Sequence, residues 1–112
     1  MRRPHKYGAT AVSVNGISFP SKKEAARWCE LVLLQKAGEI TDLERQVRFP
    51  LHGRDNWLKS DSGRTLVYVA DFVYFDKREN MTVIEDSKGA KTPEYKLKKA
   101  ILAAQGLHIK ET

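Results

Sequence analysis

The sequence has little cysteine and no long apolar run, and both absences narrow the class of protein. Cys29 is the one cysteine among 112 residues, which excludes an internal disulfide and a cysteine-based zinc site. The three histidines show no spacing typical of a metal site. No apolar stretch approaches the roughly 20 residues of a transmembrane helix, and the first residues lead into no signal-peptide core. We therefore expect a cytoplasmic protein with no membrane association.

What the sequence does have is an excess of positive charge. Lysine and arginine number 20 against 14 aspartate and glutamate, for a formal net charge of +6. Such an excess is typical of proteins that bind a polyanion such as nucleic acid, although a solvated basic surface has the same composition. The 41% hydrophobic content suffices for one core. We expect a basic flexible arm over residues 1–10 and a single domain over 11–112.

Periodicity and local signals predict a mixed α/β fold. Asn15-Gly16 is a strong hairpin signal, Ser21 and Gly38 are typical of the two ends of a helix, and Thr92-Pro93 is typical of a helix start. The predicted elements are a β-ribbon over 12–19, a helix over 21–37, strands over 43–51, 68–75 and 82–89, a helix over 91–106 and a closing strand over 107–110. The apolar stripe of the second helix is predicted at Leu97, Ala100, Ile101 and Ala104.

Ionised residues stand in two of the most apolar predicted strands. Asp71 lies in the run over 68–75, and Asp86 and Lys88 lie at the end of the run over 82–89. A buried carboxylate costs several kcal/mol unless it is paired or binds a metal. A structural ion pair between Asp71 and Lys88 would account for two of these residues and leave Asp86 unexplained. The three together therefore indicate a functional site.

The turn between these strands suggests how the acids are arranged. A hairpin that is symmetric about residues 78 and 79 places Asp71 opposite Asp86, with Cβ atoms roughly 5 Å apart. Two carboxylates that close repel each other unless a cation lies between them. Strand alternation puts Asp86 and Lys88 on one face, and a slip of one residue would put Glu85 there instead. The predicted chemistry is a hard divalent ion held by oxygen atoms.

The ordered set of motifs resembles the PD-(D/E)xK, or restriction-endonuclease-like, nuclease superfamily. Along most of the chain it is similar to small phage-encoded endonucleases of that superfamily that have long been catalogued as a domain of unknown function. The matching stretches are residues 19–25, 38–40 with Gln46, 68–74, 83–89 and 91–96. The resemblance implies an αβββαβ core, in which helices flank a central mixed sheet and the β-ribbon precedes it. Where members of the superfamily often carry a proline before the first strand acid, this chain has Ala70.

The resemblance also implies roles for individual residues. Asp71, Asp86 and the Ser87 carbonyl correspond to ligands of Mg²⁺, for which Mn²⁺ substitutes, and Lys88 corresponds to the residue that orients the attacking water or stabilises developing charge. Glu24 corresponds to a residue that contacts a second metal or its water shell, although a capping box with Ser21 explains it equally. Gln46 corresponds to an accessory polar residue near the site, or to an ordinary strand residue.

Basic residues outside these motifs are candidates for contact with DNA. Lysines of the second helix can hold a phosphate backbone, although a solvated helix face is the more usual explanation of such a run. The candidates are Lys91, Lys96 and Lys99, together with Arg2, Arg3 and Lys6 in the arm.

The resemblance predicts a metal-dependent DNA endonuclease that hydrolyses phosphodiester bonds. By analogy with nucleases of similar size, it implies a phage-encoded homodimer that acts in the bacterial host cell on branched DNA, in the manner of a Holliday-junction resolvase. Two alternatives remain open. One is a nuclease that acts on flaps, single strands or transposon ends, and the other is a catalytically silent nucleic-acid-binding module.

Overall fold

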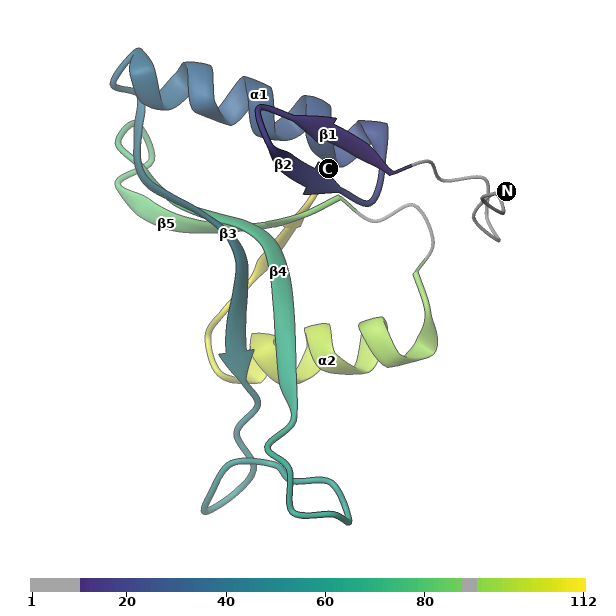
Figure 1. Ribbon diagram of the computed structural model, residues 1–112. Helices are drawn as coiled ribbons and strands as arrows, with labels where there is room; N and C mark the ends of the chain where they lie inside the picture. The colour runs from purple at the N-terminus through teal and green to yellow at the C-terminus, as the bar shows by residue number, and fades with distance from the viewer. Residues whose placement is uncertain (1–10, 88–90) are drawn as a thin grey trace, which may run out of the picture.

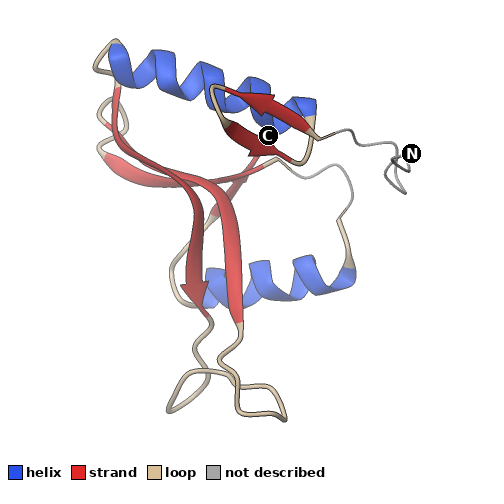
Figure 2. Ribbon diagram, in the orientation of Figure 1, coloured by secondary structure: helices blue, strands red, loops and turns tan. Residues whose placement is uncertain are grey.

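Two helices and six strands make up the described part of the protein, residues 11–87 and 91–112 of a computed structural model (Figure 2). Their order is β1 (Val12–Val14), β2 (Ile17–Phe19), α1 (Lys22–Lys36), β3 (Ile40–Pro50), β4 (Val67–Asp76), β5 (Met81–Asp86), α2 (Pro93–Ala104) and β6 (Ile109–Glu111). This order confirms the predicted mixed α/β class. The predicted arm over residues 1–10 lies outside the described residues. Neither described helix is long and apolar enough to cross a membrane.

The central sheet has the strand order β3-β4-β5-β6. β4 is antiparallel to both of its neighbours, whereas β6 runs parallel to β5. β1 and β2 form a separate antiparallel ribbon. Figure 1 shows the long β3–β4 pair bending between α1 with its ribbon at one end and α2 at the other. The sheet is therefore mixed, as the sequence predicted.

Local signals fix most of the element boundaries. Asn15 and Gly16 both adopt positive φ, at 49° and 81°, as the tight turn of a two-residue hairpin requires. The Ser21 hydroxyl caps α1 by accepting a hydrogen bond from the Glu24 amide. The Thr92 hydroxyl caps α2 by accepting one from the Tyr95 amide. β3 begins at Ile40, earlier than predicted, because a bulge between residues 41 and 44 interrupts its alternation. β6 begins later than predicted, at residue 109.

The core consists of two clusters that meet along β4. Phe72 and Tyr74 pack with residues of α1 and the ribbon, whereas Tyr68 and Ala70 pack with residues of α2 and β5. Asp71 lies between these two pairs, at the junction of the clusters. A polar residue at this point can be partly buried without interrupting the apolar packing of either cluster.

The buried face of α2 differs from the predicted stripe. Tyr95 and Leu102 are the buried residues of the helix, whereas the Leu97 side chain is 64% exposed and Ala100 and Ala104 are also exposed. Residues seven apart share one face of a helix, so Tyr95 and Leu102 form a consistent stripe. Of the predicted stripe, Ile101 does pack against the core; the rest of the prediction was wrong because it counted aliphatic residues and left out the aromatic residue of the first turn.

Candidate active site

The pairing of β4 with β5 decides which acids face each other. Phe72 pairs with Glu85 and Asp76 pairs with Met81. Extending the same register by one residue places Asp71 opposite Asp86. The predicted hairpin register is therefore confirmed, and the slip that would have exchanged Glu85 for Asp86 does not occur.

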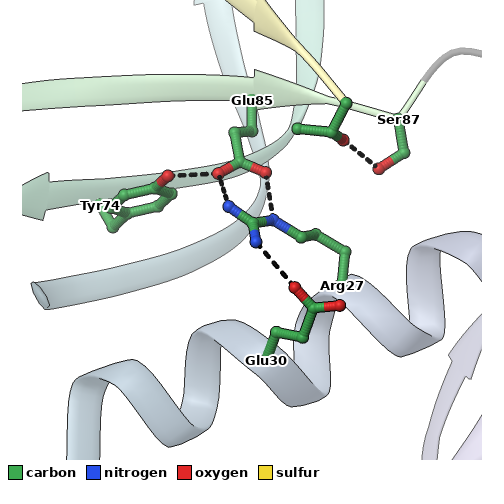
Figure 3. A network of polar contacts seen from close by, with 6 residues as sticks. Arg27, Glu30, Tyr74, Glu85 and Ser87 are labelled. Atoms are coloured by element: carbon green, nitrogen blue, oxygen red, sulfur yellow. Dashed lines mark hydrogen bonds and ion pairs between the residues drawn. The ribbon is translucent and has the colours of Figure 1, made fainter. Parts of the chain in front are cut away.

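Glu85 lies on the face that α1 covers and has a partner of its own there. Figure 3 shows the Arg27 guanidinium against this carboxylate, with Nε 2.8 Å from Oε1 and Nη2 2.6 Å from Oε2. The Tyr74 hydroxyl donates to the same carboxylate, and Glu30 accepts a further bond from Arg27 at 2.9 Å. The hydrogen bonds to Glu85 raise the pKa of Arg27. Glu85, fully buried, is thus a structural residue that attaches β5 to α1.

We expect the Arg27→Ala variant to lose about 3–5 kcal/mol of unfolding free energy, because it leaves the buried Glu85 charge without its cation. Urea denaturation at neutral pH measures this loss. Glu30→Gln serves as the control, since Glu30 is mostly exposed and surface ion pairs contribute under about 1 kcal/mol. Equal losses in the two variants would contradict the structural role of the Arg27–Glu85 pair.

Each strand aspartate receives a hydrogen bond that holds its carboxylate in place. The Ser87 amide donates to Asp71 Oδ2 at 2.8 Å, which links the end of β5 to the middle of β4. The Tyr68 hydroxyl donates to Asp86 Oδ2, and Asp86 is fully buried. Burial and this hydrogen bond raise the pKa of Tyr68, so its hydroxyl remains a donor at neutral pH. Sequence reasoning did not identify Tyr68, because residues this far apart give no local signal of contact.

Glu24 joins the two aspartates from α1. Its amide is part of the helix cap, but its side chain is 2% exposed and accepts a hydrogen bond from Gln46 Nε2 at 3.2 Å. Glu24 Oε2 is buried and has no hydrogen-bond partner within the described residues. The capping explanation thus covers the backbone of Glu24 but not its carboxylate.

Gln46 owes its position to an irregular backbone. Its φ is 51°, within a strand, and the register between the pairs on either side places it opposite Asp71. A positive φ at this point turns the Gln46 side chain out of the strand alternation. The predicted accessory residue therefore contacts Glu24, although its side chain is largely exposed.

The electrostatics of Glu24 show how close the acids lie. Burial is the largest cause that raises the pKa of Glu24, and the neighbouring Asp71 carboxyl raises it further. Arg45 lowers this pKa and Asp86 raises it by a smaller amount, so the pKa of Glu24 is about 8. The charges of Asp71 and Asp86 also both raise the pKa of Tyr68 and Tyr95. Asp71 and Asp86 therefore act together on Glu24 of α1, Tyr68 of β4 and Tyr95 of α2.

The donor set fits a hard cation that keeps part of its water shell. Among residues 11–87 and 91–112, no three His, Cys, Asp or Glu side chains are arranged so that they could hold a metal ion. Mg²⁺, however, usually takes one or two carboxylates and fills its remaining positions with water. Asp71 and Asp86 supply two carboxylates, and the buried Glu24 Oε2 lacks the partner that a metal-bound water would provide. Lys88 lies outside the described residues.

The predicted DNA-binding lysines differ in their surroundings. The Lys91 and Lys99 ammonium groups lie 3.2 Å and 3.3 Å from Glu111 Oε1, while the Tyr95 hydroxyl donates to Glu111 Oε2 at 2.6 Å. Lys96 is exposed and forms no ion pair with any described residue. Glu111, which the sequence did not indicate, pairs with Asp86 across the parallel β5–β6 register. Arg2, Arg3 and Lys6 lie outside the described residues.

Comparisons with known proteins place the chain in a family without assigning it an activity. Searches of curated proteins and of solved structures found no significant match. A family model described as "Protein of unknown function (DUF1064)" matches residues 4–112. Because this match spans nearly the whole chain, the protein belongs to the DUF1064 family.

Proposed function

We propose that the protein is a Mg²⁺-dependent endonuclease that hydrolyses phosphodiester bonds in DNA. The observation that carries the proposal is the β4–β5 register, which pairs Phe72 with Glu85 and, extended by one residue, brings Asp71 opposite Asp86. Opposed carboxylates on one face repel each other and need a cation between them. The net charge of +6 supports a polyanionic substrate, and the resemblance to the PD-(D/E)xK superfamily supports the same chemistry.

Each residue has a defined task in this proposal. Asp71, Asp86 and the Ser87 carbonyl hold the metal, and the buried Glu24 carboxylate accepts a hydrogen bond from its water shell. Mg²⁺ supplies an acidified water and neutralises charge on the phosphate. Tyr68 and the Ser87 amide keep the two aspartates oriented. Lys88, two residues after Asp86, adds positive charge where negative charge develops in the transition state.

The finer parts of the proposal concern the substrate and the assembly. Branched DNA such as a four-way junction has two symmetric strands, and a two-fold homodimer would present two matching sites to them. This part rests on analogy with nucleases of similar size.

One experiment tests the nuclease proposal directly. Labelled duplex, single-strand, flap and four-way-junction DNA are each incubated with the protein in Mg²⁺, in Mn²⁺ and in EDTA. We expect metal-dependent cleavage, strongest on the junction, and none in EDTA. Tight binding with no cleavage of any substrate in either metal would favour the silent binding module, and cleavage that persists in EDTA would contradict the metal site.

We expect Lys96→Ala to weaken binding to all DNA sequences alike and to lower the slope of log affinity against log salt by about 1, because phosphate contacts carry no base information. Lys99→Ala should have a smaller effect, since Glu111 already neutralises its ammonium. Fluorescence anisotropy over a salt series in EDTA measures both. A slope unchanged by Lys96→Ala would mean that the backbone of the DNA runs elsewhere.

A further inference from the structure

A polar pocket lies next to Ser87, the residue that follows Asp86. It has a volume of about 410 Å³ and lies between α1 and the ends of β5 and β6. Its polar lining consists of Lys23, Arg27, Glu30, Ser87, Lys110 and Thr112. We refer to it below as the Lys23 pocket. Ser87 lines this pocket and its carbonyl is a proposed metal ligand, so the pocket adjoins the proposed metal site.

The charge of the Lys23 pocket favours an anion. Three cations and one acid line it, and Arg27 is already occupied by Glu85 and Glu30. Lys23 and Lys110 form no ion pair with any of the described residues, and both are exposed. Two ammonium groups on one open pocket, without acidic partners, raise the local concentration of anions.

The rest of the lining supplies hydrogen-bonding groups on a fixed frame. The Ser87 and Thr112 hydroxyl oxygens lie 2.9 Å apart, and the Thr112 amide donates to the Asp86 carbonyl at 3.0 Å. The Arg27–Glu85 pair links α1 to β5 (Figure 3), and Arg27 also lines the pocket. Hydroxyl groups and lysines together are typical contacts of phosphate oxygens.

We propose that the Lys23 pocket binds a phosphate group of the nucleic acid strand, next to the phosphate that is cleaved. This inference rests on the proposed nuclease function and adds to it the path of the strand, which passes from the acid cluster across Ser87 and between Lys23 and Lys110. The phosphate is either an internal diester of the backbone or a terminal 5′ monoester. The pocket thus positions the substrate, and its side chains take no part in the bond-breaking step.

The test compares two double variants that remove the same charge. Lys23→Ala/Lys110→Ala alters the pocket, and Lys36→Ala/Lys77→Ala removes two exposed lysines that do not line it. Binding of labelled DNA is measured by fluorescence anisotropy in EDTA over a salt series, so that cleavage does not interfere. We expect the salt slope to fall by about 1 in the pocket variant relative to the control, and Lys23→Arg/Lys110→Arg to restore it. Melting temperatures check that each variant folds.

The outcomes separate the pocket from the nuclease proposal. If the wild-type protein binds DNA and the two double variants have equal slopes, the pocket inference is overturned while the proposed function stands. If the wild-type protein binds none of the DNA substrates, both fail. Oligonucleotides with and without a 5′ phosphate identify which phosphate binds. If the wild type binds the 5′-phosphorylated form more tightly and the pocket variant does not, the pocket binds the terminal monoester. If the pocket variant loses the same affinity for both forms, the pocket binds an internal diester.

Discussion

We expect Asp71→Asn and Asp86→Asn each to abolish metal-dependent cleavage of DNA while the protein still folds. Either change removes one ligand charge and keeps the shape of the side chain, and it relieves the repulsion between opposed carboxylates. The loss should exceed the roughly 10- to 100-fold that is typical of residues that only orient a metal ligand. Single-turnover cleavage assays in Mg²⁺ and in Mn²⁺ measure it, and calorimetric titration with Mn²⁺ should show weakened binding in both variants.

Asp42→Asn provides the matched control for these two variants. Asp42 also lies in a strand of the same sheet, but it is exposed and has a φ of 57°, which asparagine tolerates well. This variant should cleave like the wild type. Wild-type cleavage by the Asp71 or Asp86 variant would refute the assigned site, and an equal fall in melting temperature and in activity would instead indicate a structural role.

The second large effect concerns the stability of the metal-free protein as a function of pH. Glu24 has its pKa raised from its ordinary 4.5 to about 8, so between these values the folded protein holds a proton that the unfolded chain releases. The stabilisation is fully present below pH 4.5 and is lost as the pH rises through about 8. For one proton, the unfolding free energy falls by about 1.4 kcal/mol per pH unit within this window.

We expect Glu24→Gln to remove this slope, because glutamine keeps the hydrogen-bonding shape and cannot ionise. Urea denaturation in EDTA from pH 5 to pH 9 should therefore give a falling curve for the wild type and a flatter curve for the variant. Glu111 does not interfere, because its pKa is lowered to about 2 and its effect falls well below the window. Parallel curves would mean that Glu24 ionises at its ordinary pKa and that it is not crowded by the aspartates.

Addition of Mg²⁺ extends the same experiment. A cation that binds the cluster stabilises the ionised form of Glu24, so Mg²⁺ should raise the melting temperature of the wild type more at pH 8 than at pH 5. The Glu24→Gln variant should show a smaller dependence on pH. If Mg²⁺ raised the melting temperature of the wild type equally at pH 5 and pH 8, Glu24 would not be part of the metal site.

The hairpin register was the part of the candidate site that the sequence predicted well. A short polar turn between two apolar runs has few ways to pair, and alternation then puts Asp71 and Asp86 on one face and Glu85 on the other. Both signals are local, so they do not depend on the rest of the fold.

The partners of these acids could not be predicted. Tyr68 reaches Asp86, and Glu111 lies beside Asp86 with Lys91 and Lys99. Each contact joins segments that are distant along the chain. The bend of β3 and β4 or the parallel pairing of β6 with β5 brings these segments together. The buried face of α2 was missed because the prediction left out Tyr95, which packs against Tyr68 and Ala70 of β4.

The sequence by itself determined the order of the strands and helices and the hairpin register that opposes two aspartates, because these features depend on spacing within short segments. Only the tertiary structure decided that Glu85 pairs with Arg27, that the carboxyl groups of Glu24 and Asp71 lie close enough to raise a pKa, and that the Lys23 pocket adjoins Ser87. These features depend on which faces pack together, and the free energy of that packing is shared among residues that are distant along the chain.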